Sequence, residues 1–136
     1  MKVLIIDGQG GGLGRQLVTA IKERAGQAEV LAVGTNSTAT GAMLRAGADQ
    51  AATGENAVLA ACRRADVIVG PIGIVIADSM LGEITPAMAA AVGQSRAKRI
   101  LLPVSQCDNI IVGTANLSMA EKVREAADFL SGLLGQ

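Results

Sequence analysis

The stretch Lys2–Ile21, KVLIIDGQGGGLGRQLVTAI, decides the fold. Its first six residues, Lys2–Asp7, form a short apolar run, and this length favours a buried β-strand. Five glycines follow within the seven residues Gly8–Gly14. From Leu13 to Ala25, apolar side chains recur at the spacing of an amphipathic helix. A strand, a glycine-rich loop and a helix in this order predict the first unit of an α/β sheet.

The rest of the chain continues the alternation of strands and helices. Further strands are expected at Glu29–Val33, Gln50–Ala52, Val67–Val69 and Ile100–Val104, with a short edge strand at Asn109–Val112. Helices are expected from Ser37 to Arg45, through Val58–Cys62, from Thr85-Pro86 to about Val92, and from the capping box at Ser118–Glu121 to Leu134. This order predicts one Rossmann-like three-layer α/β domain over residues 1–136, with a mostly parallel sheet of about five strands.

Composition and charge narrow the classes of function. The 12 Lys and Arg residues balance the 12 Asp and Glu residues, and the chain has one Phe and no Tyr or Trp. Without a basic excess or aromatic side chains on which bases stack, no nucleic-acid binding is expected. The chain has no histidine, which removes the commonest general base and the commonest metal ligand. We therefore expect no metal site and no Ser-His-Asp or Cys-His catalysis within one chain.

The sequence also indicates the cellular compartment. Two cysteines do not make a disulfide framework, and no run of about 18 apolar residues predicts a membrane span. The chain begins directly with a predicted strand, with no signal peptide ahead of it. A cytoplasmic protein that does not enter membranes is expected.

The glycine-rich loop predicts a phosphate site. Glycines let backbone N–H groups approach a phosphate, and the following helix adds a partial positive charge at its N-terminus. Gly8, Gly12 and Gly14 fit the pattern G-x-x-x-G-x-G, which resembles the cofactor loop of short-chain dehydrogenases. The catalytic tyrosine of that family has no counterpart here, so its catalysis does not carry over. The residues expected to contact the ligand are Asp7, Gly8, Gln9, Gly10, Gly11, Gly12, Leu13 and Gly14. The alternative is a tight turn that binds nothing.

Two polar positions near this loop leave alternatives open. No acidic residue follows the second predicted strand, where NAD-binding domains use one to bind ribose. Thr35 and Asn36 would instead bind a ribose or a 2′-phosphate, which favours NADP over NAD, or a phosphate-bearing nucleotide that is not a dinucleotide. Ser37 would equally serve only to cap a helix. Asp7 would hold Mg²⁺ or a ribose hydroxyl, or anchor the loop by accepting backbone N–H bonds.

Other candidates lie where the remaining strands end. The carboxyl ends of parallel strands form the ligand crevice of such a sheet, which adds Thr53, Gly70, Pro71 and Ile72 to the expected binding residues. Asp78, Glu83 and Cys107 are the candidates for catalysis. Each also has an ordinary structural interpretation, as a carboxylate near a helix start or a packed thiol.

Four stretches together resemble a known family. They are IDGQGGGLG (6–14), VGTNSTATGAMLRAGA (33–48), ATGENAV (52–58) and VGPIGIVIADSMLGEITPAMA (69–89). They look like a family of short bacterial proteins described only as a domain of unknown function. The resemblance implies a Rossmann-like bacterial protein and supplies no activity, substrate or catalytic residue.

The function expected from these residues is a nucleotide- or dinucleotide-binding module that acts as a sensor or as a subunit. One alternative is a small NAD(P)-dependent oxidoreductase or nucleotide-processing enzyme, completed by a dimer partner. The other is a structural or interaction protein whose glycine loop is empty. Because the segment Ile72–Ile84 is too apolar for an exposed loop, a homodimer is expected through it and the helix after Pro86.

Overall fold

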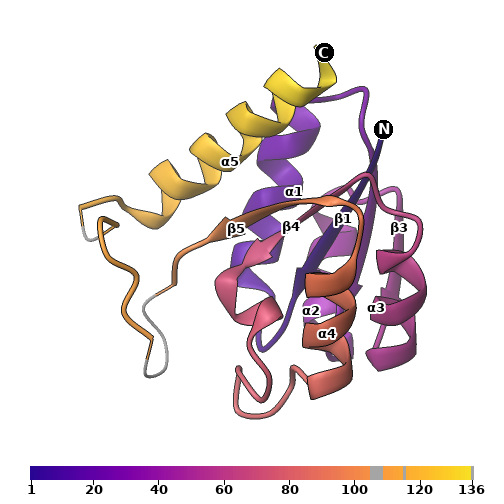
Figure 1. The fold of residues 1–136 in the computed structure, drawn as a ribbon. Helices are drawn as coiled ribbons and strands as arrows, with labels where there is room; N and C mark the ends of the chain where they lie inside the picture. Colours follow the sequence, from indigo (N-terminus) through magenta and orange to yellow (C-terminus); the bar gives the residue numbers. More distant parts are fainter. Residues whose placement is uncertain (105–108, 115, 136) are drawn as a thin grey trace.

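The computed structural model describes residues 1–104, 109–114 and 116–135 and shows one parallel five-stranded sheet with helices on both faces (Figure 1). Along the sheet the strand order is β3-β2-β1-β4-β5. The strands are β1 (Lys2–Asp7), β2 (Glu29–Gly34), β3 (Gln50–Thr53), β4 (Val67–Pro71) and β5 (Lys98–Leu102). The strands β1, β2 and β3 follow one another to one edge of the sheet, and β4 then pairs with the other side of β1. The loops that follow the neighbouring strands β1 and β4 therefore lead away in opposite directions. That is the position at which open α/β sheets bind ligands.

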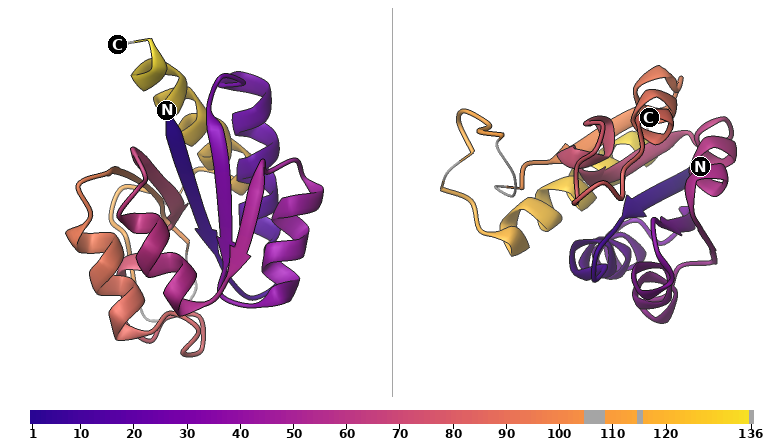
Figure 2. Two further views of the ribbon diagram at one scale, coloured as in Figure 1. Left: turned by 90° about the vertical axis from the view of Figure 1, so that its right-hand side faces the viewer. Right: turned by 90° about the horizontal axis from the view of Figure 1, so that it is seen from below.

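The helices form two outer layers (Figure 2). One layer consists of α1 (Gly12–Arg24), α2 (Ser37–Arg45) and α5 (Met119–Leu134), and the other of α3 (Glu55–Cys62) and α4 (Pro86–Gln94). A short 3₁₀ helix, η1 (Ile72–Val75), follows β4 directly. Helix α5 packs along α1, far from it in the sequence.

The two helix layers bury opposite faces of the strands. In β1, Val3 and Ile5 lie in the core under α1 and α5, whereas Leu4 and Ile6 lie in the core under α3 and α4. All four side chains are at most 1% exposed. A strand buried on both faces reads as a continuous apolar run, which is why KVLIID carries no alternation of polar residues.

Most predicted elements are present, but one expected strand is absent from the described residues. The final helix begins at the capping box that the sequence indicates, because Ser118 accepts the Glu121 N–H at 3.1 Å and the Glu121 side chain accepts the Ser118 N–H. The edge strand expected at Asn109–Val112 is wrong, since these residues pair with no strand of the sheet. Among the described residues, no helix is long and apolar enough to cross a membrane.

Candidate functional site

The glycine-rich loop joins the carboxyl end of β1 to the start of α1. Asp7, the last residue of β1, is 5% exposed and accepts a 2.7 Å hydrogen bond from the N–H of Gly14. Burial raises the pKa of Asp7 above its ordinary value, although the N–H groups of Gly14 and Gly8 act in the opposite direction. Asp7 thus has the contact expected of a loop anchor, one of the two roles that the sequence left open.

Three of the five glycines are required by packing. A Cβ at Gly8 would lie 2.6 Å from Thr35 Oγ1, and one at Gly14 would lie 2.6 Å from Met43 Sδ. Gly11 has a φ of +73°, and its Cβ would lie 2.7 Å from the Cα of Ala39. At these distances a neighbouring atom has to move before a side chain fits, and at Gly11 that atom belongs to the backbone. The fold itself therefore explains these three glycines.

The other two glycines are not required by the described structure. A Cβ at Gly10 or Gly12 would meet no described atom within 4 Å, and neither residue has a positive φ. In addition, the N–H groups of Gly10, Gly12 and Leu13 donate no hydrogen bond within the part of the chain that the structure describes. Open space and free donors at the start of a helix are what a bound phosphate needs.

A pocket lies over this part of the loop. It has a volume of about 300 Å³. Residues 7–13 and Gln16 form one side of it. The other side comes from the end of β4 (Pro71), the chain after β5 (Val104), the start of α5 (Met119) and the segment after η1 (Met80). The pocket thus lies at the carboxyl edge of the sheet, toward β4 and β5 rather than β2.

On the β2 side of the loop, the polar groups are joined to Glu83. The carboxylate oxygen Oε1 of Glu83 accepts hydrogen bonds from the Thr35 hydroxyl, from Asn36 Nδ2 at 2.8 Å and from the Gln9 N–H at 2.9 Å. Asn36 Nδ2 also donates to the Gln9 carbonyl at 2.9 Å, and Asn36 Oδ1 caps α2 by accepting the Ala39 N–H. Donation by Thr35 is the main reason that the pKa of Glu83 lies below its ordinary value.

The other expected binding residues lie at the carboxyl ends of their strands, with Thr53 last in β3, Gly70 and Pro71 last in β4 and Ile72 directly after it, but they differ in what they contact. Pro71 lines the loop pocket, whereas Ile72 lines a smaller hollow of about 40 Å³ beside it. Thr53 Oγ1 lies 2.7 Å from Thr40 Oγ1, away from the glycine loop. A Cβ at Gly70 would lie 2.5 Å from the Ile6 carbonyl, so this glycine is required by close packing of β4 on β1.

The structure describes two of the three catalytic candidates, Asp78 and Glu83, and no hydrogen bond joins their side chains. Asp78 is exposed, Glu83 is engaged by the loop, and Cys107 lies outside the described residues. The other cysteine, Cys62, is buried in the core under α3 and α4, and burial raises its pKa to about 11. Within residues 1–104, 109–114 and 116–135, no three potential metal ligands lie together.

The segment Ile72–Ile84 covers the edge of the sheet and packs largely on its own chain. Ile74 and Ile84 are fully buried in the core under α3 and α4. Its apolar composition is therefore explained in part without a partner. One large side chain of the segment, Leu81, remains 95% exposed.

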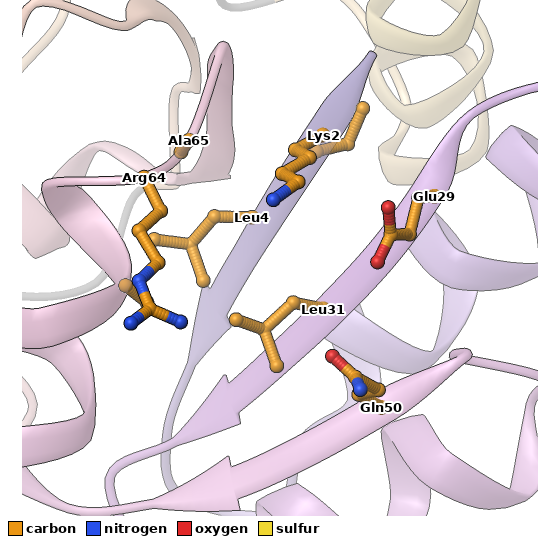
Figure 3. Close-up of a pocket in the computed structure, with 9 residues that line it drawn as sticks. Lys2, Leu4, Glu29, Leu31, Gln50, Arg64 and Ala65 are labelled. Atoms are coloured by element: carbon orange, nitrogen blue, oxygen red, sulfur yellow. The ribbon is translucent and has the colours of Figure 1, made fainter.

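A second hollow lies at the opposite, amino end of the strands (Figure 3). Leu4 and Leu31 form its floor, and Lys2, Glu29 and Arg64 surround it. Its volume is only about 80 Å³, which is too small for a nucleotide.

The family model described as "Domain of unknown function (DUF3842)" matches residues 2–134. The chain belongs to this family. The matched range includes the glycine loop, the residues that line the pocket and the segment with Glu83. No curated protein matches the sequence significantly.

One solved structure supports the fold. A dodecameric FMN-dependent UbiX-like decarboxylase from Escherichia coli O157:H7 is similar over 100% of this chain and 96% of its own, with 16% identity and a TM-score of 0.54. A universal stress protein in complex with cAMP covers 74% of this chain and 94% of its own, with 19% identity and a TM-score of 0.38. The first of these confirms a Rossmann-like three-layer domain for DUF3842.

Sequence reasoning missed several residues of this DUF3842 site. Gln16, Met80, Val104 and Met119 line the pocket, and none of them belongs to a sequence motif that indicates ligand binding. Gln16 lies one helical turn after Gly12, so helical spacing alone could have placed it on the same face of α1 as the loop. The others come from distant elements, and only the topology brings them to the loop.

Proposed function

We propose that this protein binds a phosphate-bearing nucleotide at the loop 8–13, as a sensor or as a binding subunit. The observation that carries the proposal is the open space at Gly10 and Gly12, two glycines that line the pocket and that packing does not require. A side chain at either position would project where a ligand's phosphate has to approach the backbone.

The free N–H groups supply the recognition. Those of Gly10, Gly12 and Leu13 donate to no residue that the structure describes, and the last two belong to the first turn of α1, where the helix dipole favours an anion. Asp7 lies behind the loop with its carboxylate turned to Gly14. Because its negative charge is already engaged by N–H groups, repulsion of a phosphate is reduced.

The class of nucleotide is part of the proposal. The similar decarboxylase is described as FMN-dependent. FMN is therefore a candidate beside NAD, NADP and other nucleotides, and the low identity leaves all of them to be tested. An enzyme completed by a second subunit, or an interaction protein with an empty loop, is the alternative.

We also propose a homodimer through Ile72–Ile84 and α4. Leu81, 95% exposed at the turn of that segment, is the observation in its favour. A single large apolar side chain held in solvent gains about 1.5–3 kcal/mol when a partner covers it fully.

The test is thermal unfolding of the protein with a panel of ligands, namely FMN, FAD, NAD, NADP, AMP, ADP, ATP, GTP, coenzyme A and inorganic phosphate, each with and without Mg²⁺. A ligand at 100 times its dissociation constant is expected to stabilise the fold by about 2.7 kcal/mol, a shift of several degrees for a domain of this size. If none of these ligands raises the unfolding temperature, the proposal is wrong and the interaction role takes its place.

A further inference from the structure

The pocket over the glycine loop lies on the β4 and β5 side of the loop, where Pro71 and Val104 line it. On the β2 side, the space beside Gly8 is filled. A Cβ at Gly8 would lie 2.6 Å from Thr35 Oγ1, 2.7 Å from Met80 Sδ and 3.0 Å from Glu83 Oε1.

The cover on the β2 side consists of Met80 and Glu83, and Glu83 is held by hydrogen bonds from two other parts of the chain. Glu83 Oε1 accepts from the loop at Gln9 and from Thr35 and Asn36 after β2. Ile84, the next residue, is fully buried and fixes the segment to the core under α3 and α4. The Thr35 hydroxyl and the Asn36 amide nitrogen therefore already donate to Glu83, and these hydrogen bonds compete with those that a ligand would need.

This arrangement matters because a dinucleotide carries a nucleoside on each side of its pyrophosphate. When the pyrophosphate lies on the first loop of a doubly wound sheet, one of the two nucleosides extends over the end of the second strand. Here that place is taken by Met80 and Glu83. A second phosphate near Glu83 would also meet a carboxylate of the same sign.

We infer that the site takes a mononucleotide, whose nucleoside or flavin extends toward Val104 and Met119, and that Met80 and Glu83 exclude a dinucleotide. This inference rests on the proposed function. The pocket of about 300 Å³ is at the lower end of the volumes that ligand sites have, which suits one nucleoside rather than two. Its walls away from the loop are mainly apolar, with Pro71, Met80, Val104 and Met119 available to pack on a ring.

The experiment compares matched pairs by titration calorimetry on the full chain. FMN is paired with FAD and ADP with NAD, because each smaller ligand is contained in the larger one. For at least one pair, the unaltered protein is expected to bind the mononucleotide tighter by about tenfold or more. If the mononucleotide binds no tighter than the dinucleotide that contains it in either pair, the inference is overturned.

A double variant tests the cause. Met80→Ala with Glu83→Ala removes the cover, and the ratio of mononucleotide to dinucleotide affinity is expected to fall toward one. This ratio is the readout, rather than the mononucleotide affinity itself, because Met80 also lines the pocket. Unchanged discrimination in a variant that still binds the mononucleotide would overturn the role of these residues. If the variant does not fold, the comparison on the unaltered protein still decides. Failure of every ligand of both kinds to bind would instead contradict the proposed function.

Discussion

The carboxylate of Asp7 accepts a 2.7 Å hydrogen bond from the N–H of Gly14 and so closes the glycine loop onto α1. This contact explains how a buried carboxylate is tolerated beside a proposed phosphate site. Asp7 is buried there, and burial disfavours its charged form. The stability of the folded protein is therefore expected to depend on pH through Asp7.

Asp7 is expected to make the protein less stable as the pH rises from acid toward neutral. Because the pKa of Asp7 in the folded protein lies above its ordinary value of 3.8, the folded state retains the proton longer than the unfolded state. The stability of the unaltered protein relative to Asp7→Asn should therefore fall as the pH rises through this range, and should be constant well below pH 3.8. Urea unfolding at several pH values measures this difference. A relative stability that rises with pH would mean that the Asp7 charge is favourable in the fold.

Gly11 and Gly12 are expected to respond in opposite ways to the same substitution. Gly11→Ala places a Cβ 2.7 Å from the Ala39 backbone at a φ of +73°, and should destabilise the fold by about 2–4 kcal/mol. Gly12→Ala enters open space in the first turn of α1 and should leave stability unchanged or raise it by up to about 1 kcal/mol. Thermal unfolding of the two variants checks this contrast. Equal losses of stability would show that Gly12 is structural after all.

The fold was predictable because its signals are local. The apolar run KVLIID, the capping box at Ser118 and the Thr85-Pro86 helix start each act over a few residues, and each is found where the sequence indicates it. The error at Asn109–Val112 has the same origin. Ile110 and Val112 are apolar, but both are 91% exposed and find no strand to pair with.

The site was only partly predictable because its contacts are not local. The glycine spacing indicates a loop for phosphate, but it does not separate the glycines that packing requires from those with open space. Glu83 lies 74 residues from Gln9 in the sequence, and only the path of the segment after β4 brings the two together. For the same reason, Thr35 and Asn36 appeared free for a ribose, whereas the fold uses them to hold Glu83.

Glu83→Gln is expected to lower stability at neutral pH. The substitution keeps the shape of the side chain and removes the charge that strengthens its three hydrogen bonds, so a loss of about 1 kcal/mol is expected. Because the pKa of Glu83 in the folded protein lies below its ordinary value of 4.5, this loss should be full above pH 4.5 and should shrink as the pH falls through the folded pKa. Urea unfolding at neutral and acid pH measures it.

The matched control for Glu83 is Glu23→Gln, on the exposed side of α1. It should change stability little at either pH. A Glu83→Gln variant that behaves like this control would show that the charge of Glu83 on its three hydrogen bonds contributes nothing to the stability of the fold.

Leu81→Asp is expected to separate the proposed homodimer. Light scattering of the unaltered protein should give twice the chain mass of 13.7 kDa, and the variant should give the chain mass itself. Val112→Asp, at another exposed apolar residue outside the segment, should leave the dimer intact. An unaltered protein that remains at 13.7 kDa at high concentration would contradict the dimer.

The most direct measurement for the glycine-loop site is the affinity of Gly12→Val for the best ligand of the panel, by titration calorimetry beside the unaltered protein. Gly132→Val in α5 is the matched control, because its Cβ also meets no described atom within 4 Å and it lies near the other end of that helix from Met119. Both variants are expected to fold. Gly132→Val should bind as the unaltered protein does, and Gly12→Val should lose binding by about a hundredfold or more. A folded Gly12→Val that keeps full affinity would contradict a ligand on this loop.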